Sequence, residues 1–108
     1  MTEQVENDTL TVEIAEDGVI VVHGDIDIAG GPVLDEALVR SEEGLPIVLN
    51  LSDVYFIDSS GLRSLLNASR RARLADSHVV LRSVGAEVRR LLEITGTSGQ
   101  FTIDGYRD

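Results

Sequence analysis

Two short apolar runs, each followed by a segment with helical spacing, constrain the fold of this chain more than any other feature. Residues 46–51 (PIVLNL) have the length and composition of a central strand that is buried on both faces, and 78–81 (HVVL) form a second apolar strand. Apolar and small side chains then recur at helical period over 62–72 after the first run and over 88–92 after the second. This order predicts an α/β fold with a parallel or mixed sheet and right-handed crossovers.

The preceding part of the chain predicts a β-hairpin and one more helix. Apolar and polar residues alternate over 10–14, and Glu16-Asp17-Gly18 supplies a turn before the apolar run 19–22. Helical spacing begins at Pro32, a residue that suits the first turn of a helix, and we expect this helix to end near Gly44.

The length of 108 residues allows a single domain with one core. Residues 1–8 are polar and lack periodicity, so we expect a flexible N-terminus followed by a folded domain over 9–108. Residues 101–103 are expected to add a last edge strand. The helices are expected to cover a mixed sheet.

Composition excludes several classes of function. The absence of cysteine excludes disulfides and thiolate catalysis, and no apolar run approaches the roughly 18 residues that a membrane helix needs. Residues 1–17 carry six acids and no base, unlike a signal peptide, so we expect a cytoplasmic protein.

The charge of the chain indicates what kind of partner it binds. A net charge of −10 disfavours binding to nucleic acid and favours a basic or mixed-charge protein as the partner. The charge is also divided along the chain, because residues 1–58 hold fourteen acids and one base whereas 59–108 hold five acids and eight bases. All nine bases are arginine, so the chain contains no lysine.

The segment 56–62 (FIDSSGL) carries the strongest functional signal, because it lies at the turn between a strand and a helix. Ser59 or Ser60 could serve simply as the N-cap of that helix. A helix N-terminus also offers free N–H groups and the positive end of a dipole, so a phosphate on Ser59 could be held there without unfolding the helix.

Four segments together resemble the STAS domain of bacterial anti-sigma factor antagonists. They are 24–27 (GDID), 47–51 (IVLNL), 56–62 (FIDSSGL) and 86–96 (AEVRRLLEITG), and their order and spacing match over about residues 9–103.

The resemblance implies a regulatory binding protein and not an enzyme. In that family the serine at the position of Ser59 is phosphorylated, with ATP as donor, by a serine kinase that is itself the anti-sigma factor. The unphosphorylated form binds this kinase and frees the sigma factor, and a serine phosphatase is expected to reset the switch. The resemblance implies no cofactor and no metal, and it assigns partner binding to Asp25, Asp27, Asp58, Ser60, Gly61, Leu62 and Arg63.

Two departures from the family pattern stand out. Arg63 occupies a position where the family usually has glycine or another small residue, which leaves the identity of the partner open. Because Arg63 follows Ser59 by four residues, it either contacts the phosphate or is an exposed arginine without a partner. The family also usually ends in a further helix where this sequence stops at Asp108.

Other small acidic α/β proteins fit the sequence less well. A phosphoryl-accepting receiver domain and a P-loop both require a lysine, which is absent. A serine hydrolase requires G-x-S-x-G and a histidine, but residue 58 is Asp, and His23 and His78 lie in strand-like segments. No spacing of carboxylates resembles a metal-binding loop. The remaining alternative is a STAS-like structural adaptor of a membrane lipid transporter or of a signalling scaffold, which would need no phosphorylatable serine.

Overall fold

The computed structural model describes residues 3–6, 10–39 and 45–107. The elements along the chain are β1 (Glu3–Glu6), β2 (Leu10–Ile14), β3 (Ile20–Gly24), α1 (Gly31–Val39), β4 (Ile47–Asp53), α2 (Ser59–Leu74), β5 (Val79–Val84), α3 (Ala86–Thr95), the short 3-10 helix η1 (Ser98–Gln100) and β6 (Thr102–Tyr106). The predicted α/β fold, the N-terminal hairpin and all three predicted helices are confirmed.

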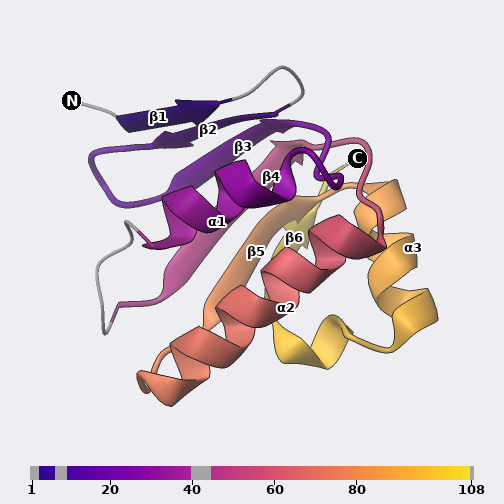
Figure 1. The fold of residues 1–108 in the computed structure, drawn as a ribbon. Coiled ribbons are helices and arrows are strands. Elements are labelled where there is room, and N and C mark those ends of the chain that lie inside the picture. Colours follow the sequence, from indigo (N-terminus) through magenta and orange to yellow (C-terminus); the bar gives the residue numbers. More distant parts are fainter. Residues whose placement is uncertain (1–2, 7–9, 40–44, 108) are drawn as a thin grey trace.

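The strands form one six-stranded sheet in which their spatial order equals their order in the sequence. Strands β1, β2 and β3 pair antiparallel, and β3 through β6 pair parallel (Figure 1). In a parallel sheet the carboxyl ends of the strands share one edge, and the loops that follow β3 and β4 both leave the sheet there. This edge is at the top of Figure 1.

Helices α1 and α2 lie on the same side of the sheet (Figure 1). Alternate strand residues on that side are buried, as Leu49 and Leu51 of β4 are, whereas Val48 and Asn50 on the opposite side are only partly buried. The prediction that 46–51 is buried on both faces is therefore wrong. Among the described residues no helix covers the second face, so β4 alternates like a strand of a half-covered sheet.

The ends of the chain also differ from expectation. Residues 3–6, expected to be flexible, form β1 and pair with β2, with Val5 opposite Val12. The expected end of the first helix near Gly44 falls outside the described residues, and α1 ends at Val39 where the description stops. The expected edge strand at 101–103 is present but lies at Thr102–Tyr106.

Candidate switch site at the N-terminus of α2

Helix α2 begins with a cap provided by Asp58. Its carboxylate Oδ1 accepts a hydrogen bond from the Gly61 N–H at 2.9 Å, and its carbonyl oxygen accepts one from the Leu62 N–H at 2.9 Å. Asp58 therefore performs the capping that the sequence allowed Ser59 or Ser60 to perform. The two serine hydroxyls are not needed to start the helix.

Ser59 and Ser60 occupy the first two positions of α2. Ser59 is exposed and Ser60 is partly buried, and among the described residues neither hydroxyl has a hydrogen-bond partner. The cap likewise leaves the backbone N–H groups of both serines without a partner in the described part of the chain. An anion attached at Ser59 would thus meet free donors and the positive end of the α2 dipole.

Gly61 and Leu62, expected at the partner surface, are buried. A Cβ at Gly61 would lie 2.0 Å from the carbonyl oxygen of Ile26, so only glycine lets the loop after β3 pack against the start of α2. That loop is tied to the approach to α2, since Ile26 N–H donates to Phe56 O at 3.0 Å and Asp58 N–H donates to Ile26 O at 3.2 Å. Gly61 and Leu62 therefore pack the start of α2 against the core and the loop after β3, and so hold residues 54–58, called the switch loop below, in place.

The loop after β3 presents Asp25 and holds Asp27. Asp25 is exposed, as expected for a residue that faces a partner. Asp27 is partly buried, and its Oδ1 accepts a hydrogen bond from the Gly30 N–H at 2.8 Å, which closes the turn that leads into α1. Because Ile26 pairs with Ile57, both aspartates belong to a segment that lies beside Asp58. Arg63, one turn beyond Ser59, is exposed.

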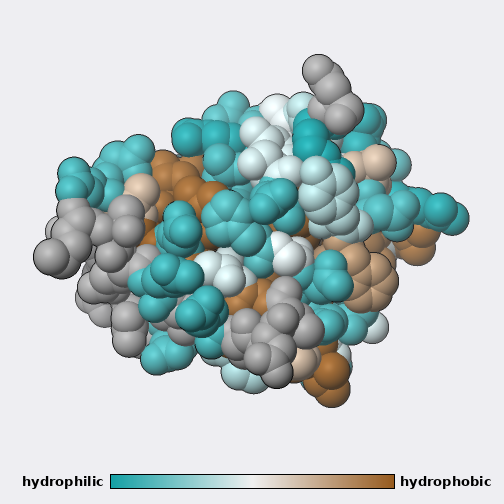
Figure 2. Space-filling model, turned by 90° about the horizontal axis from the view of Figure 1, so that it is seen from above, coloured by the Kyte–Doolittle hydropathy of each residue, from teal (hydrophilic) through white to brown (hydrophobic). Residues whose placement is uncertain are grey.

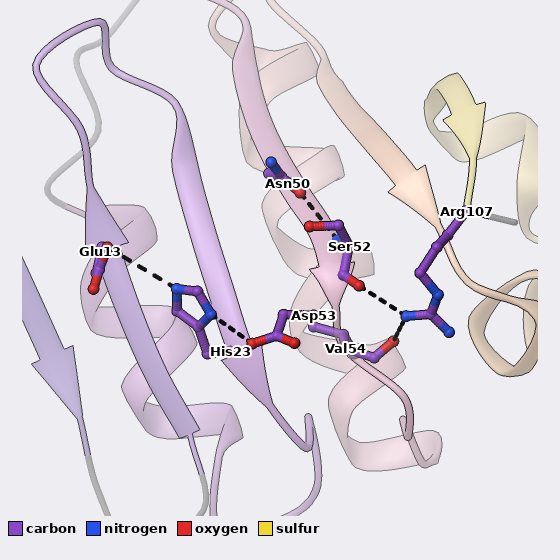
Figure 3. A network of polar contacts seen from close by, with 7 residues as sticks. All are labelled: Glu13, His23, Asn50, Ser52, Asp53, Val54 and Arg107. Carbon is purple, nitrogen blue, oxygen red and sulfur yellow. Dashed lines mark hydrogen bonds and ion pairs between the residues drawn. The ribbon is translucent and has the colours of Figure 1, made fainter.

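The end of β4 is fastened on both sides, so the switch loop starts from a fixed point (Figure 3). On one side, His23 Nδ1 of β3 lies 2.7 Å from Asp53 Oδ2, where a shift of register between β3 and β4 brings the two residues opposite each other. On the other side, Arg107 Nη1 donates to Ser52 O at 2.9 Å and to Val54 O at 3.2 Å. The residues that these interactions hold, 52–54, lie five to seven positions before Ser59 in the sequence.

Sequence reasoning missed the exposed apolar residues near the switch loop. Ile28 is 76% exposed, Tyr55 60% and Phe56 47%, and the Arg107 guanidinium stacks over the Tyr55 ring at 4.0 Å. Seen from above, the surface is mostly hydrophilic with separate apolar patches (Figure 2). The available signal was the run of four apolar residues 54–57 (VYFI) before the helix, of which Val54 and Ile57 enter the core while Tyr55 and Phe56 remain at the surface.

Within the described ranges, no three His, Asp or Glu side chains are grouped to hold a metal ion. None of the helices in those ranges is long and apolar enough to cross a membrane.

Comparison with known proteins identifies the family. The sequence model of the STAS domain family matches residues 9–105 of this chain. The chain belongs to the STAS domain family. A relative from Listeria monocytogenes, named anti-sigma-B factor antagonist, is 36% identical over 81 residues, which cover 73% of this chain and 71% of the relative. A protein of the same name from Bacillus subtilis is 33% identical over 76 residues, covering 69% of this chain and 70% of the relative.

Solved structures with the same fold include proteins named for different roles. An anti-sigma factor antagonist from Mycobacterium paratuberculosis superimposes with a TM-score of 0.69 at 24% identity, covering 96% of this chain and 84% of the other. A sulfate transporter family protein from Wolinella succinogenes superimposes with a TM-score of 0.65 at 18% identity, covering 78% of this chain and 73% of the other. A STAS fold alone therefore does not separate a switch protein from a transporter module.

Proposed function

We propose that this chain is an anti-sigma factor antagonist whose partner is a serine-kinase anti-sigma factor. In its unphosphorylated form it binds that kinase and releases the sigma factor. Transfer of the γ-phosphoryl group of ATP to the Ser59 hydroxyl switches binding off, and a serine phosphatase restores the active form. Such a protein acts in the cytoplasm, where its sigma factor works.

The observation that carries this proposal is the exposed Ser59 hydroxyl at the start of a helix that Asp58 already caps. A kinase can reach the hydroxyl, and its modification costs no capping interaction. The relatives at 36% and 33% identity, both named anti-sigma-B factor antagonist, support the same function.

The surrounding residues divide into two proposed roles. Asp25, Ser60 and Arg63 are at least partly exposed beside Ser59 and are proposed to contact the partner, together with the uncommitted oxygen of Asp58. Asp27, Gly61 and Leu62 hold the loop in place by the contacts described above. Arg63 also follows Ser59 by four residues, so it is close enough in the helix to contact a phosphate on Ser59.

The test is phosphorylation of the purified chain by its anti-sigma factor kinase with ATP, followed by phosphopeptide mapping. Phosphate is expected on Ser59, and the Ser59→Ala protein is expected to take up none. Ser60→Ala removes a hydroxyl that is proposed to contact the kinase, so it should be modified more slowly than wild type but still on Ser59. Phosphate on Ser60 alone, or a normal rate of modification in Ser59→Ala, would contradict the proposal.

A structural adaptor for a transporter or scaffold is the competing function, and the shared fold of the Wolinella succinogenes protein is the observation in its favour. An adaptor has no need of a phosphorylatable residue at position 59. Failure of every anti-sigma factor kinase encoded in the same genome to bind or modify the chain would favour the adaptor.

A further inference from the structure

Helix α2 carries four positive charges and no negative charge, in a chain whose net charge is −10. Its arginines are Arg63, Arg70, Arg71 and Arg73, which we call the arginine face. All four are exposed, and none forms an ion pair with a described residue. Four unpaired cations on one helix of an acidic protein call for an explanation beyond solubility.

The other arginines of the described chain are mostly occupied. Arg82 pairs with Asp104 at 3.2 Å, and Arg89 pairs with Glu93 at 2.8 Å, a hydrogen bond that raises the pKa of Arg89. Arg107 donates to the Ser52 carbonyl of β4 and to the Val54 carbonyl just after it. On α2, by contrast, Arg70 and Arg73 reach only the neutral side chains of Asn67 and Gln100. The full positive charge of α2 therefore remains available to a partner.

The geometry of a helix places this charge next to the switch serine. Each residue turns the helix by about 100°, so Arg63, Arg70, Arg73 and Leu74 lie within about 60° of Ser59 around the axis. Arg71 lies about 120° from Ser59 and flanks this strip. With a rise of 1.5 Å per residue, this strip extends about 22 Å from Ser59 to the end of α2. Leu74, at the far end, is 83% exposed and supplies an apolar contact. The strip is one continuous surface that begins at the modification site.

We propose that the arginine face of α2 docks an acidic surface of the partner protein, and that this contact guides the partner onto Ser59. The inference rests on the proposed function, because the partner meant is the kinase that modifies Ser59. Charge complementarity selects the occupant: the arginine face attracts carboxylates, whereas the net charge of −10 repels a nucleic acid that extends beyond α2.

The same docking contact would also be weakened by phosphorylation of Ser59. Carboxylates that the partner places along α2 lie near Ser59, because the strip starts there. A phosphate on Ser59 then brings negative charge against those carboxylates and partly neutralises Arg63. Attraction in the free form and repulsion in the phosphorylated form thus come from the same acidic surface of the partner.

The experiment measures the association rate of the chain with its anti-sigma factor kinase by stopped flow, from about 0.05 M to about 0.5 M salt. Arg70→Glu is expected to slow association about tenfold at low salt and to weaken the dependence on salt, and Arg70→Gln to slow it about threefold. Arg82→Gln is the matched control, because it removes the same charge from the opposite side of the sheet, and it should associate at the wild-type rate. Equal rates for wild type and Arg70→Glu, or equal slowing by Arg82→Gln, would overturn the proposal.

A second measurement separates the acidic surface from the proposed switch. A Glu-rich helical peptide of about 20 residues, long enough to span α2, is added to the labelled chain at low salt. The amide signals of α2 are expected to shift, and Arg70→Glu to abolish the shifts. Absence of shifts in α2 overturns the docking proposal even if Ser59 is phosphorylated normally. If the wild-type chain neither binds the kinase nor is modified at Ser59, the proposed function fails and the docking proposal fails with it.

The Arg70→Glu variant also tests two other molecules that could bind the arginine face. A salt-sensitive dimer of the free chain that Arg70→Glu dissociates would make a second copy the occupant. Salt-sensitive binding of a short double-stranded DNA that Arg70→Glu abolishes would make it nucleic acid. Either result overturns the proposal.

Discussion

At the scale of single residues, the switch site depends on which of three adjacent polar residues starts α2. The sequence led us to expect Ser59 or Ser60 as the N-cap, which was wrong, because aspartate caps a helix as well as serine does and local propensity does not separate the three residues. The structure selects Asp58 because the Ile26 carbonyl accepts its N–H and because the helix turn at Gly61 must fit against Ile26. The N-cap residue is therefore determined by packing of the loop after β3 against the start of α2, which local propensity does not report.

The contact between Gly61 and Ile26 leads to a prediction about stability. Gly61→Ala should lower the free energy of unfolding by about 1–3 kcal/mol, because the new methyl group meets the Ile26 carbonyl and the loop must move. This loss should exceed the gain of about 0.5–1 kcal/mol that alanine normally brings to a helix. Urea unfolding provides the measurement. Gly99→Ala, where nothing lies within 4 Å of the new Cβ, is the control and should be nearly neutral. Equal stability of Gly61→Ala and wild type would show that the loop yields without cost.

The roles of the acidic site residues were only partly predictable. The resemblance to the STAS family placed Asp25, Asp27 and Asp58 near Ser59, and the pairing of Ile26 with Ile57 brings their segments side by side. Asp27 and Asp58 each accept a hydrogen bond from a backbone N–H group. These bonds depend on the geometry of turns that form only in the folded chain. An aspartate before a helix is as often a cap as a contact residue, so its sequence context alone does not assign the role.

At the scale of elements, apolar patterning predicted the central strands and helices, and backbone pairing produced the rest. The sequence EQVE of β1 has no clear strand period, but the free edge of β2 gives its backbone hydrogen-bonding partners. Strand β6 extends beyond the predicted 101–103 because its pairing with β5 continues to Tyr106. Edge strands need little apolar character of their own, which is why their limits are hard to read from a sequence.

The ends of α2 and α3 lead to the next prediction. Both helices end in a Schellman motif, with a left-handed residue that is Asp76 after α2 (φ 57°) and Gly96 after α3 (φ 69°). A glycine such as Gly96 is a common sign of a helix end, whereas an aspartate such as Asp76 is not. Asp76→Gly should raise the free energy of unfolding by about 0.5–1 kcal/mol, because glycine adopts this conformation without strain.

Gly96→Ala is the counterpart of Asp76→Gly and should lower stability by about 1 kcal/mol. Nothing lies within 4 Å of a Cβ at Gly96, so its effect reports backbone conformation and not crowding. Thermal and urea unfolding of the two variants provide the measurement. A stability loss in Asp76→Gly would mean that the Asp76 side chain contributes more than its backbone strain costs.

At the scale of the whole molecule, the sheet fixes one edge from which the switch loop projects. His23 and Arg107 hold the end of β4 from opposite sides, and Gly61 locks the start of α2 against the loop after β3. The site is therefore built on a rigid frame, and a modification at its exposed tip need not alter the fold. Rigidity of this kind favours a switch that acts through surface charge.

Phosphorylation of Ser59 is accordingly predicted to weaken partner binding locally, without refolding. The phosphate adds a charge of about −1.5 to −2 next to Asp58 and near the segment that holds Asp25. At an effective dielectric constant of about 20, two like unit charges roughly 5 Å apart repel by about 3 kcal/mol. Because about 1.4 kcal/mol changes an affinity tenfold, a single partner carboxylate at that distance is enough to switch binding, even after partial screening.

Titration calorimetry against the kinase, with amide spectra of each form, tests this account. Ser59→Ala should bind constitutively, and Ser59→Asp, which carries one charge, should bind more weakly than wild type but more tightly than the phosphoprotein. Amide shifts on phosphorylation should be confined to the start of α2 and the loop after β3, because the hydrogen bonds of Ile26 are the direct connection between them. Undiminished binding by the phosphoprotein would remove charge repulsion as the cause. Shifts spread across β4, β5 and β6 would instead indicate a change of the whole sheet, which the fastened end of β4 opposes.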